Sequence, residues 1–322
     1  MGLIIAYGIW RANSALQVTN QEPTKVLELQ PKDANNPGSK EIYFSLVRPQ
    51  NQQVITSSPV TIKAITRPNT IVAISSEDKD YLTSSLDNGS LETEISLVGG
   101  VNEIIFTAFP DSLEQLSEKL VLVYSSEFVK EVKEESPSSD IEKRVKEKLE
   151  EAKNLATSYI GTITDISQEA IQVDKFDFNG NSGEILQIGI SEKTNFIKID
   201  KTREVIKFSD VAIGDFLVAM GYKMENAVLD AQRILIINPL KKTSRKIIKA
   251  KVLEIKKGKI LLEQSEGKNL SVNIPDNIVV KKFKEGSLIK AKPSEIVKDV
   301  RIIVVGQMNE DNELEARTVF LI

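Results

Sequence analysis

The stretch that decides the fold reads Ser209-Asp-Val-Ala-Ile-Gly-Asp-Phe-Leu-Val-Ala-Met-Gly221, and it continues through Leu229 and Ala231 to Ile237. Its apolar pattern returns 85 positions later as Ser294-Glu-Ile-Val-Lys-Asp-Val-Arg-Ile-Ile-Val-Val-Gly306, continuing through Leu314 and Ala316 to Ile322. Segments that share one alternation place the same side chains toward a core. We therefore expect residues 209–237 and 294–322 to form equivalent hairpins.

The repeat extends upstream, where Ile160-Gly-Thr-Ile-Thr-Asp-Ile166 corresponds to Lys249-Ala-Lys-Val-Leu-Glu-Ile255 at an offset of 89. The extra four residues fall near Asn179-Gly-Asn-Ser-Gly183, as a hairpin tip would tolerate. Val218 and Ile303 should lie in matching strands. Gly221 and Gly306 should lie at the same strand end, where glycine relieves crowding. The charge difference between the two units should then lie on outward-facing residues.

Residues 41–125 show a different pattern of short strands separated by turn signals. Leu91, Thr93, Ile95 and Leu97 alternate with Glu92, Glu94 and Ser96, as in strands with one buried face. The turn signals are Ser57-Ser58-Pro59, Arg67-Pro68-Asn69, Asp87-Asn88-Gly89, Gly99-Gly100 and Pro110. Their spacing predicts a β-sandwich of about seven strands.

Two resemblances rest on these residues. The runs Pro59–Ile74 and Leu91–Ala108, with Gly100, Asn102 and Ile104 in the pattern Gly-x-Asn-x-Ile, resemble a bacterial Ig-like domain of the glucodextranase-B-like type. That resemblance implies a spacer or binding module of an exported protein rather than an active site. Ala64 departs from it, since such domains often have glycine there.

Residues 159–240 resemble the small OB-like barrels of unknown function found in exported bacterial proteins, with Gly161, Gly214, Asp215 and Gly221 in the expected pattern. Residues 241–322 lack the counterparts of Gly161 and Gly214, so their assignment rests partly on the repeat. The expected fold is mainly β: an Ig-like β-sandwich, a helical linker and two repeated OB-like β-barrels.

The linker is marked by alternating Lys and Glu around Ser136-Pro137-Ser138-Ser139. Ser139 and Glu142 have capping-box spacing, and Ile141, Val145, Leu149, Ala152 and Ala156 fall on one helical face. These features predict a helix over 140–157 that docks on the following barrel, with self-association as the alternative. The domain order is then a residual hydrophobic anchor or signal segment (1–15), a polar spacer (16–40), the sandwich (41–125), the charged linker and helix (126–158), and barrels over 159–240 and 241–322.

Composition removes several classes of chemistry, because the 322 residues include no histidine and no cysteine. A Ser-His-Asp triad, a thiolate nucleophile, a disulfide and a zinc–thiolate site all need one of these residues. Carboxylate, lysine or tyrosine chemistry and oxygen-bound cations remain open. We predict no enzymatic activity, no catalytic, cofactor-binding or metal-binding residues, and no cofactor.

The first ten residues form an apolar block, Met1 to Trp10, that ends before Arg11. The block is shorter than the roughly 20 residues of a spanning helix and lacks the basic start of a signal peptide. We interpret it as the outer end of a membrane anchor or signal; an N-terminal strand or a tail is the alternative. Localisation outside the cytoplasm or at the cell surface is the resulting expectation.

The C-terminal unit, residues 241–322, is basic, with eighteen Lys/Arg against eleven Asp/Glu. A patch of basic residues can follow a phosphate backbone. The candidate residues are Lys241, Lys242, Arg245, Lys246, Lys281, Lys282 and Lys284. Single-strand binders also need aromatic faces, and this unit holds only Phe283 and Phe320. Nucleic acid is therefore the lesser expectation, beside a solvated lysine-rich face or contact with anionic polymers or lipid head groups.

Three weaker patterns have ordinary structural explanations. Asp177, Asn179, Asn181 and Glu184 gather oxygen ligands, but the spacing is not that of an EF-hand, and a hairpin tip is favoured. Gly99-Gly100 and residues 180–183 are too sparse for a phosphate loop. Glu92 and Glu94 lie on an alternating strand, which indicates a solvent face rather than a glycosidase pair.

Together these patterns favour a non-catalytic structural or binding protein of the cell envelope. Its partners would be envelope proteins, glycans or anionic polymers, with the membrane reached through the N-terminal segment. Nucleic-acid or polyanion binding by the basic barrel is the alternative, and a carboxylate-dependent glycan-active protein is the third hypothesis. The sequence leaves open the identity of the ligand and the oligomeric state.

Overall fold

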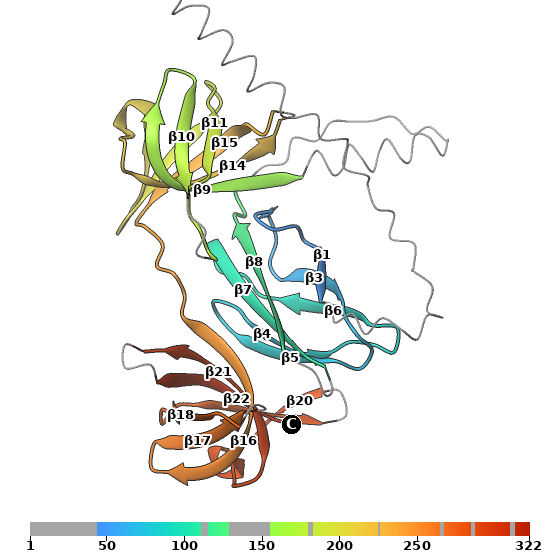
Figure 1. The fold of residues 1–322 in the computed structure, drawn as a ribbon. Helices are drawn as coiled ribbons and strands as arrows, with labels where there is room; N and C mark the ends of the chain where they lie inside the picture. The colour runs from blue at the N-terminus through green and yellow to red at the C-terminus, as the bar shows by residue number, and fades with distance from the viewer. Residues whose placement is uncertain are drawn as a thin grey trace, which may run out of the picture. The chain divides into compact units, whose positions relative to one another are not determined.

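The computed structural model describes residues 44–110, 115–128, 155–179, 183–224, 226–264, 267–284, 287–309 and 313–322. The described residues fall within one compact unit, Tyr43–Ile322, and are built almost entirely from strands. The expectation of a mainly β chain is confirmed. Figure 1 shows three groups of strands, here called the first (β1–β8), second (β9–β15) and third (β16–β22) modules.

The first module has two sheets that share one core. The three-stranded sheet has the order β1 (Ser45–Arg48), β3 (Val60–Ile65), β6 (Ser90–Ile95), and the five-stranded sheet has the order β2 (Val54–Ile55), β8 (Leu116–Tyr124), β7 (Gly100–Phe109), β4 (Ile71–Ser75), β5 (Asp80–Ser84). Ile62 and Ile95 from one sheet pack with Ile74, Phe106 and Leu122 from the other. The alternation seen in residues 91–97 is confirmed, since Leu91 and Ile95 are buried and Glu92 and Glu94 are exposed.

The second and third modules have the same strand order. The second comprises β9 (Ala156–Ile166), β10 (Ala170–Lys175), β11 (Ile185–Gly189), β12 (Asn195–Ile199), β13 (Arg203–Ile206), β14 (Phe216–Lys223) and β15 (Leu229–Ile237). The third comprises β16 (Arg245–Lys256), β17 (Lys259–Gln264), β18 (Asn269–Asn273), β19 (Val279–Lys284), β20 (Ser287–Lys290), β21 (Arg301–Met308) and β22 (Leu314–Leu321). Parallel pairing of β11 with β15, and of β18 with β22, closes a ring of five strands in each module.

Both expected hairpins are present with matching register. Val218 pairs with Leu235 and Ile160, and Ile303 pairs with Phe320 and Lys249. These pairings keep the sequence offsets of 85 and 89. The matching strands follow from the shared alternation of apolar residues along the two segments.

The two glycines occupy equivalent places, but not the strand end that the sequence suggested. Gly221 and Gly306 are each the sixth of eight residues in β14 and β21, beside a register shift. A Cβ atom would lie 1.9 Å from the Asp230 carbonyl oxygen at Gly221 and 2.3 Å from that of Glu315 at Gly306. Close approach of the partner backbone, rather than strand termination, therefore requires glycine.

The charged residues of the second and third modules lie outside the two apolar cores, as expected, but the outward faces of β14 and β21 are apolar. In β14, Leu217 and Ala219 face the second module's own core, while Val218 and Met220 join an apolar cluster with Val121 and Val123 of β8. The same division occurs in the third module. There, Ile302 and Val304 face inward, whereas Ile303 and Val305 pack with Ala73, Leu82 and Phe109 of the first module. Both modules thus dock on the outer face of the five-stranded sheet.

The helix expected over 140–157 falls mostly outside the described residues, and its predicted end is wrong, because Ala156 and Thr157 belong to β9. Thr157 forms an isolated bridge with Gln53, so pairing and burial outweigh the helical pattern there. The anchor segment and spacer, residues 1–40, lie outside the described residues. Among the residues that the structure describes, no helix is long and apolar enough to cross a membrane.

Candidate functional site

The basic residues singled out in the third module do not form one free surface. Arg245 has only 7% of its side chain exposed, and its Nη2 lies 2.8 Å from Glu77 Oε1 while also donating to the Glu103 carbonyl oxygen. Lys281 donates to the Asp80 carbonyl oxygen at 3.1 Å, and burial lowers its pKa, against the opposing effect of Asp80. Arg245 and Lys281 therefore bind the first module.

Arg317 makes the most extensive of these contacts, although sequence reasoning did not single it out. Its guanidinium binds both carboxylate oxygens of Asp80, with Nε to Oδ2 at 2.9 Å, and Nη2 donates to the Ser76 carbonyl oxygen at 2.8 Å. The Asp80 side chain is 1% exposed. We call Asp80, Glu77, Arg245, Lys281 and Arg317 the charged interface. Asp80 lies far from Arg317 in the sequence, so no local sequence pattern predicts this ion pair.

The other basic candidates remain at the surface. Lys241, Lys242, Lys246, Lys282 and Lys284 are exposed, with Lys242 Nζ 3.9 Å from Asp177 Oδ2. The aromatic rings of residues 241–322 are not exposed with them. Phe320 is fully buried and Phe283 packs in the same cluster, against residues of the first module. Phe320 and Phe283 are therefore engaged in packing, whereas single-strand binders present aromatic rings for stacking bases.

The described residues of the acidic loop in the second module have local partners. Asp177 Oδ1 accepts a hydrogen bond of 2.8 Å from the Asn179 backbone N–H, and Glu184 pairs with Lys175 at 2.6 Å. Asn181 lies outside the described residues. No group of three or more acidic residues in the described part of the chain is arranged to hold a metal ion.

The other weak candidates also have structural roles. Glu92 pairs with Lys63 at 3.1 Å on an exposed face, and Glu94 is exposed on the same strand. Gly100 opens β7 with a positive φ of 94°. Residues 180–182 lie outside the described residues.

The second module is joined to the end of the first through Glu127. Its carboxylate binds the guanidinium groups of Arg203 and Arg233, the latter at 2.6 Å. The hydrogen bond from Arg203, followed by that from Arg233, lowers the pKa of Glu127 from 4.5 to about 2. This carboxylate therefore stays ionised in all but strongly acidic solution.

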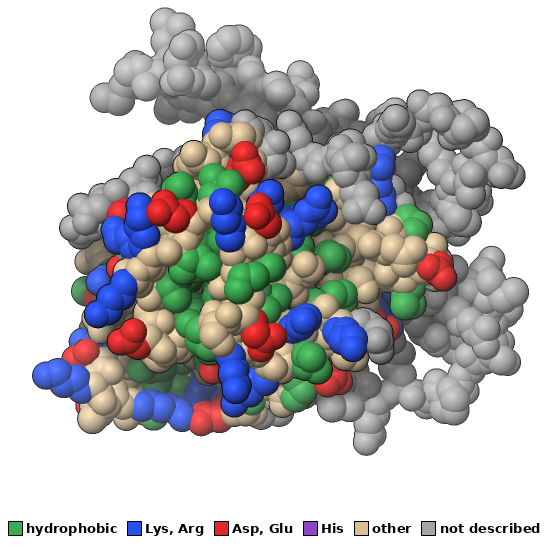
Figure 2. All heavy atoms as spheres, turned by 90° about the horizontal axis from the view of Figure 1, so that it is seen from below, with side chains coloured by type: hydrophobic (Ala, Val, Ile, Leu, Met, Phe, Trp, Pro, Cys, Tyr) green, Lys and Arg blue, Asp and Glu red, His purple; other side chains and the backbone are tan. Residues whose placement is uncertain are grey.

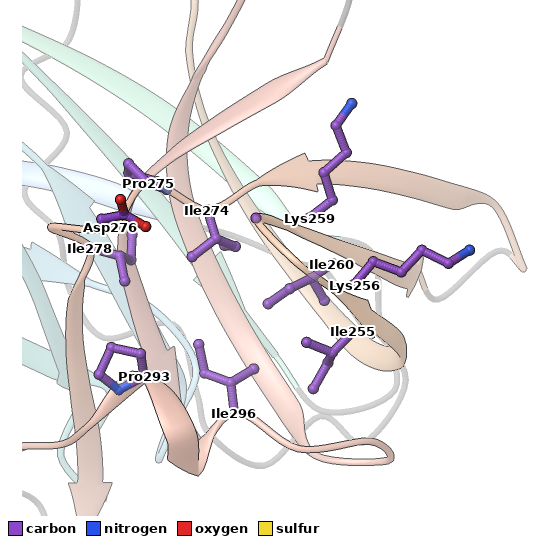
Figure 3. A pocket seen from close by; sticks show the side chains of 11 residues that line it. Ile255, Lys256, Lys259, Ile260, Ile274, Pro275, Asp276, Ile278, Pro293 and Ile296 are labelled. Carbon is purple, nitrogen blue, oxygen red and sulfur yellow. The ribbon is translucent and has the colours of Figure 1, made fainter.

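A hollow of about 250 Å³ in the third module is a candidate ligand site. Figure 3 shows the side chains of Ile255, Ile260, Ile274, Ile278 and Ile296 converging on it, with Pro293 beside them. They come from β16, β17, the segment between β18 and β19, and the short helix η2 (Pro293–Glu295) with the residue after it. Sequence reasoning missed the hollow, because its lining is scattered along the chain.

The rim of the hollow carries Lys256, Lys259 and Asp276, and both lysines are paired with glutamates. Lys256 Nζ lies 3.1 Å from Glu254 and Lys259 Nζ lies 2.7 Å from Glu313, and Figure 3 shows both lysine side chains directed away from the isoleucines. The hydrogen bond from Lys259, then that from Asn273, lowers the pKa of Glu313. Figure 2, which views the molecule of Figure 1 from below, shows a surface with hydrophobic side chains among Lys, Arg, Asp and Glu. The lining suits binding of an apolar group rather than acid–base chemistry.

No model of a known protein family matches this chain, and no curated protein matches it. The function is therefore argued from the geometry of the charged interface, the docked modules and the hollow.

Proposed function

We propose that this chain is a non-catalytic structural protein of the bacterial cell envelope, built to hold three β modules as one rigid scaffold. The observation that supports this proposal is the docking of the second and third modules on one face of the five-stranded sheet through equivalent strands. Val218 and Ile303 are counterparts at an offset of 85, and each lies in an apolar cluster shared with the first module. Modules that act only as flexibly linked spacers would not need apolar surfaces shared between them.

Polar contacts at both docking surfaces favour one orientation of the second and third modules on the first. In the second module, Ser158 donates to the Gln52 carbonyl oxygen from its backbone N–H and from its hydroxyl, each at 2.8 Å. In the third module, the charged interface joins Arg317 to Asp80 and Arg245 to Glu77. Buried polar residues such as Asp80 and Ser158 are satisfied only in one geometry, whereas apolar area alone would permit several. The scaffold would therefore be specific in orientation as well as stable.

The first module is proposed to be Ig-like. Its three-stranded sheet β1-β3-β6 faces the five-stranded sheet β2-β8-β7-β4-β5, and β2 pairs with β8 in parallel while its neighbours are antiparallel. Two mostly antiparallel sheets around one core are the architecture of the immunoglobulin sandwich. This assignment supports the role of a spacer or binding module.

The second and third modules are proposed to be repeated OB-like barrels. In each, five strands form a ring through the order β11-β10-β9-β14-β15 or β18-β17-β16-β21-β22. Five closed strands are typical of the OB barrel, and along the chain a hairpin is inserted between β11 and β14 (β12–β13) or between β18 and β21 (β19–β20). The shared register of the two modules favours a repeat of one unit.

The proposed location outside the cytoplasm rests on the resemblances of the modules and on the apolar block Met1 to Trp10. A membrane-anchored form would keep that block, and an exported form would lose it. Polyanion binding is the lesser proposal, because the charged interface uses Arg245, Lys281 and Arg317. A glycan-active role has less support, since Glu92 is paired with Lys63 on an exposed face.

Protease accessibility in a bacterium that carries the natural reading frame tests the location. Protease added to intact cells or to cells with a permeabilised outer layer should digest the protein while a cytoplasmic marker survives. Protection until the cytoplasmic membrane is lysed, with the protein in the soluble cytoplasmic fraction, would contradict the proposal.

A further inference from the structure

We propose that the hollow of the third module is a binding site for a small neutral aromatic molecule. This inference goes beyond the scaffold function and does not depend on it, because it concerns one end of a single barrel. It follows from comparing that end with its counterpart in the second module.

The counterpart in the second module is filled by aromatic side chains. Phe208 opens the short helix η1 (Phe208–Asp210), and its ring is stacked on Phe196, with the ring centroids 5.5 Å apart and an interplanar angle of 29°. Phe208 and Ile206 pack against the core of the second module, of which Phe196 is a buried member. This end of the barrel therefore closes around a stack of two rings.

The third module has smaller residues at the same three places. Val280 takes the place of Phe196, because Val280 pairs with Val319 as Phe196 pairs with Ile234. Ala291 takes the place of Ile206, because its N–H donates to the Val280 carbonyl oxygen and Ile206 pairs with Phe196. Pro293 opens η2 where Phe208 opens η1, and both helices carry the same capping arrangement. Two phenylalanines and an isoleucine are thus replaced by valine, proline and alanine. Of the three places, Pro293 lines the hollow, so the side-chain volume lost where Phe208 is replaced lies at the end of the barrel where the hollow is found.

The size and lining of the hollow suit an aromatic ring. A closed apolar cavity of about 150 Å³ binds benzene, and this hollow measures about 250 Å³ and is partly open to solvent. Five isoleucines and Pro293 form the apolar part of the lining, and the charged side chains that also line it, Lys256, Lys259 and Asp276, are exposed, so a ligand would leave no buried polar group among them unsatisfied. Removal of a planar apolar ring from water is then the driving force, as it is for Phe208 in the second module.

The charges at the rim favour a neutral ligand. Lys256 and Lys259 are already paired with Glu254 and Glu313, so an anionic group would compete with existing partners. An anionic group would also meet the Asp276 carboxylate, and a cationic group would meet two ammonium groups. A ligand without charge does not disturb these ion pairs and is not repelled by the lysines. Small polar substituents on it can remain in water at the open side of the hollow.

The experiment uses 4-fluorotoluene as the probe, observed by fluorine NMR with the full chain. Saturable binding at one site is expected. The variant Ala291→Ile/Pro293→Phe gives the third module two of the side chains of the second and should weaken binding by at least about tenfold, a loss expected when a filled pocket removes the contact area. Ile289→Phe is the matched control, because Ile289 lies on β20 with 48% exposure and does not line the hollow. Its binding should equal that of the natural chain.

Two further measurements keep the test independent of any single variant. Methyl NMR of the natural chain should show probe-induced shifts at Ile255, Ile260, Ile274, Ile278 and Ile296. The variant Ile206→Ala/Phe208→Ala should open the counterpart in the second module and raise the number of bound probes from one to two. Lack of saturable binding by the natural chain, shifts confined to other isoleucines, or unchanged binding by a folded Ala291→Ile/Pro293→Phe variant would each overturn the proposal.

Discussion

At the scale of single residues, the charged interface should contribute much more to the free energy of unfolding than an exposed ion pair of similar chemistry. Asp80 is almost fully buried against Arg317, whereas Glu92 and Lys63 are both exposed. Removing Asp80 leaves the guanidinium group of Arg317, which is 37% exposed, without its buried carboxylate partner. We expect Asp80→Ala to lower the free energy of unfolding by about 2–4 kcal/mol and Glu92→Ala by less than about 1 kcal/mol. Urea titrations of the two variants make the comparison, and equal losses would contradict the assigned role of Asp80.

Glu127 gives the chain a pH-dependent contact. Its pKa is lowered from 4.5 to about 2 by Arg203 and Arg233. A carboxyl group whose pKa is lower in the folded state contributes stability above its unfolded pKa and loses it as the pH falls through the folded pKa. The natural chain should therefore lose more stability between about pH 4.5 and pH 2 than Glu127→Gln. Melting temperatures across that range measure the effect, and parallel curves would argue against it.

The glycine beside the register shift in β21 is required by backbone contact. A Cβ on Gly306 would lie 2.3 Å from the Glu315 carbonyl oxygen, while one on Gly99 would meet nothing within 4 Å. Gly306→Ala should cost about 1–3 kcal/mol through overpacking, whereas Gly99→Ala should change stability by no more than about 0.5 kcal/mol. Thermal unfolding of both variants measures the difference. An unchanged stability of Gly306→Ala would show that β21 and β22 can move apart at little cost in free energy.

At the scale of elements, period-two alternation was enough to predict the strands of the first module and both hairpins of the repeat. It could not tell what lies on the second face of β14 and β21, where Val218 and Ile303 are buried as fully as their inward neighbours. A strand buried on both faces reads as a continuous apolar run. Such a run indicates burial without naming the partner, so docking could not be deduced from sequence.

The helix prediction illustrates a different limit. Ala156 fits both the helical face that was proposed and the alternation of β9, in which it is buried. Short apolar segments are ambiguous between the two periods, and here pairing with β14 decided the outcome. The hollow had a usable signal, since the repeat aligns Phe208 with Pro293, but only the strand register shows that three substitutions meet at one end of the barrel.

At the scale of the whole molecule, the sequence predicts proteolytic cleavage near residues 126–140, with release of a stable sandwich and a stable double barrel. The cleavage region lies largely outside the described residues, but the docking surfaces change the expected products. The two fragments should remain associated after cleavage and elute together in gel filtration, because apolar clusters join the first module to both others. Separate elution of two folded fragments at moderate salt would contradict rigid docking.

Thiol labelling of single-cysteine variants tests the docked scaffold most directly, because the natural chain has no cysteine to interfere. Val304 and Val305 are neighbours on β21 and both are fully buried, but Val304 packs in the third module's own core and Val305 against the first module. If the modules are docked, Val304→Cys and Val305→Cys should both label slowly in the native protein, while Ile289→Cys at the surface labels fast. Rapid labelling of Val305→Cys beside a protected Val304→Cys would show an undocked third module and contradict the account.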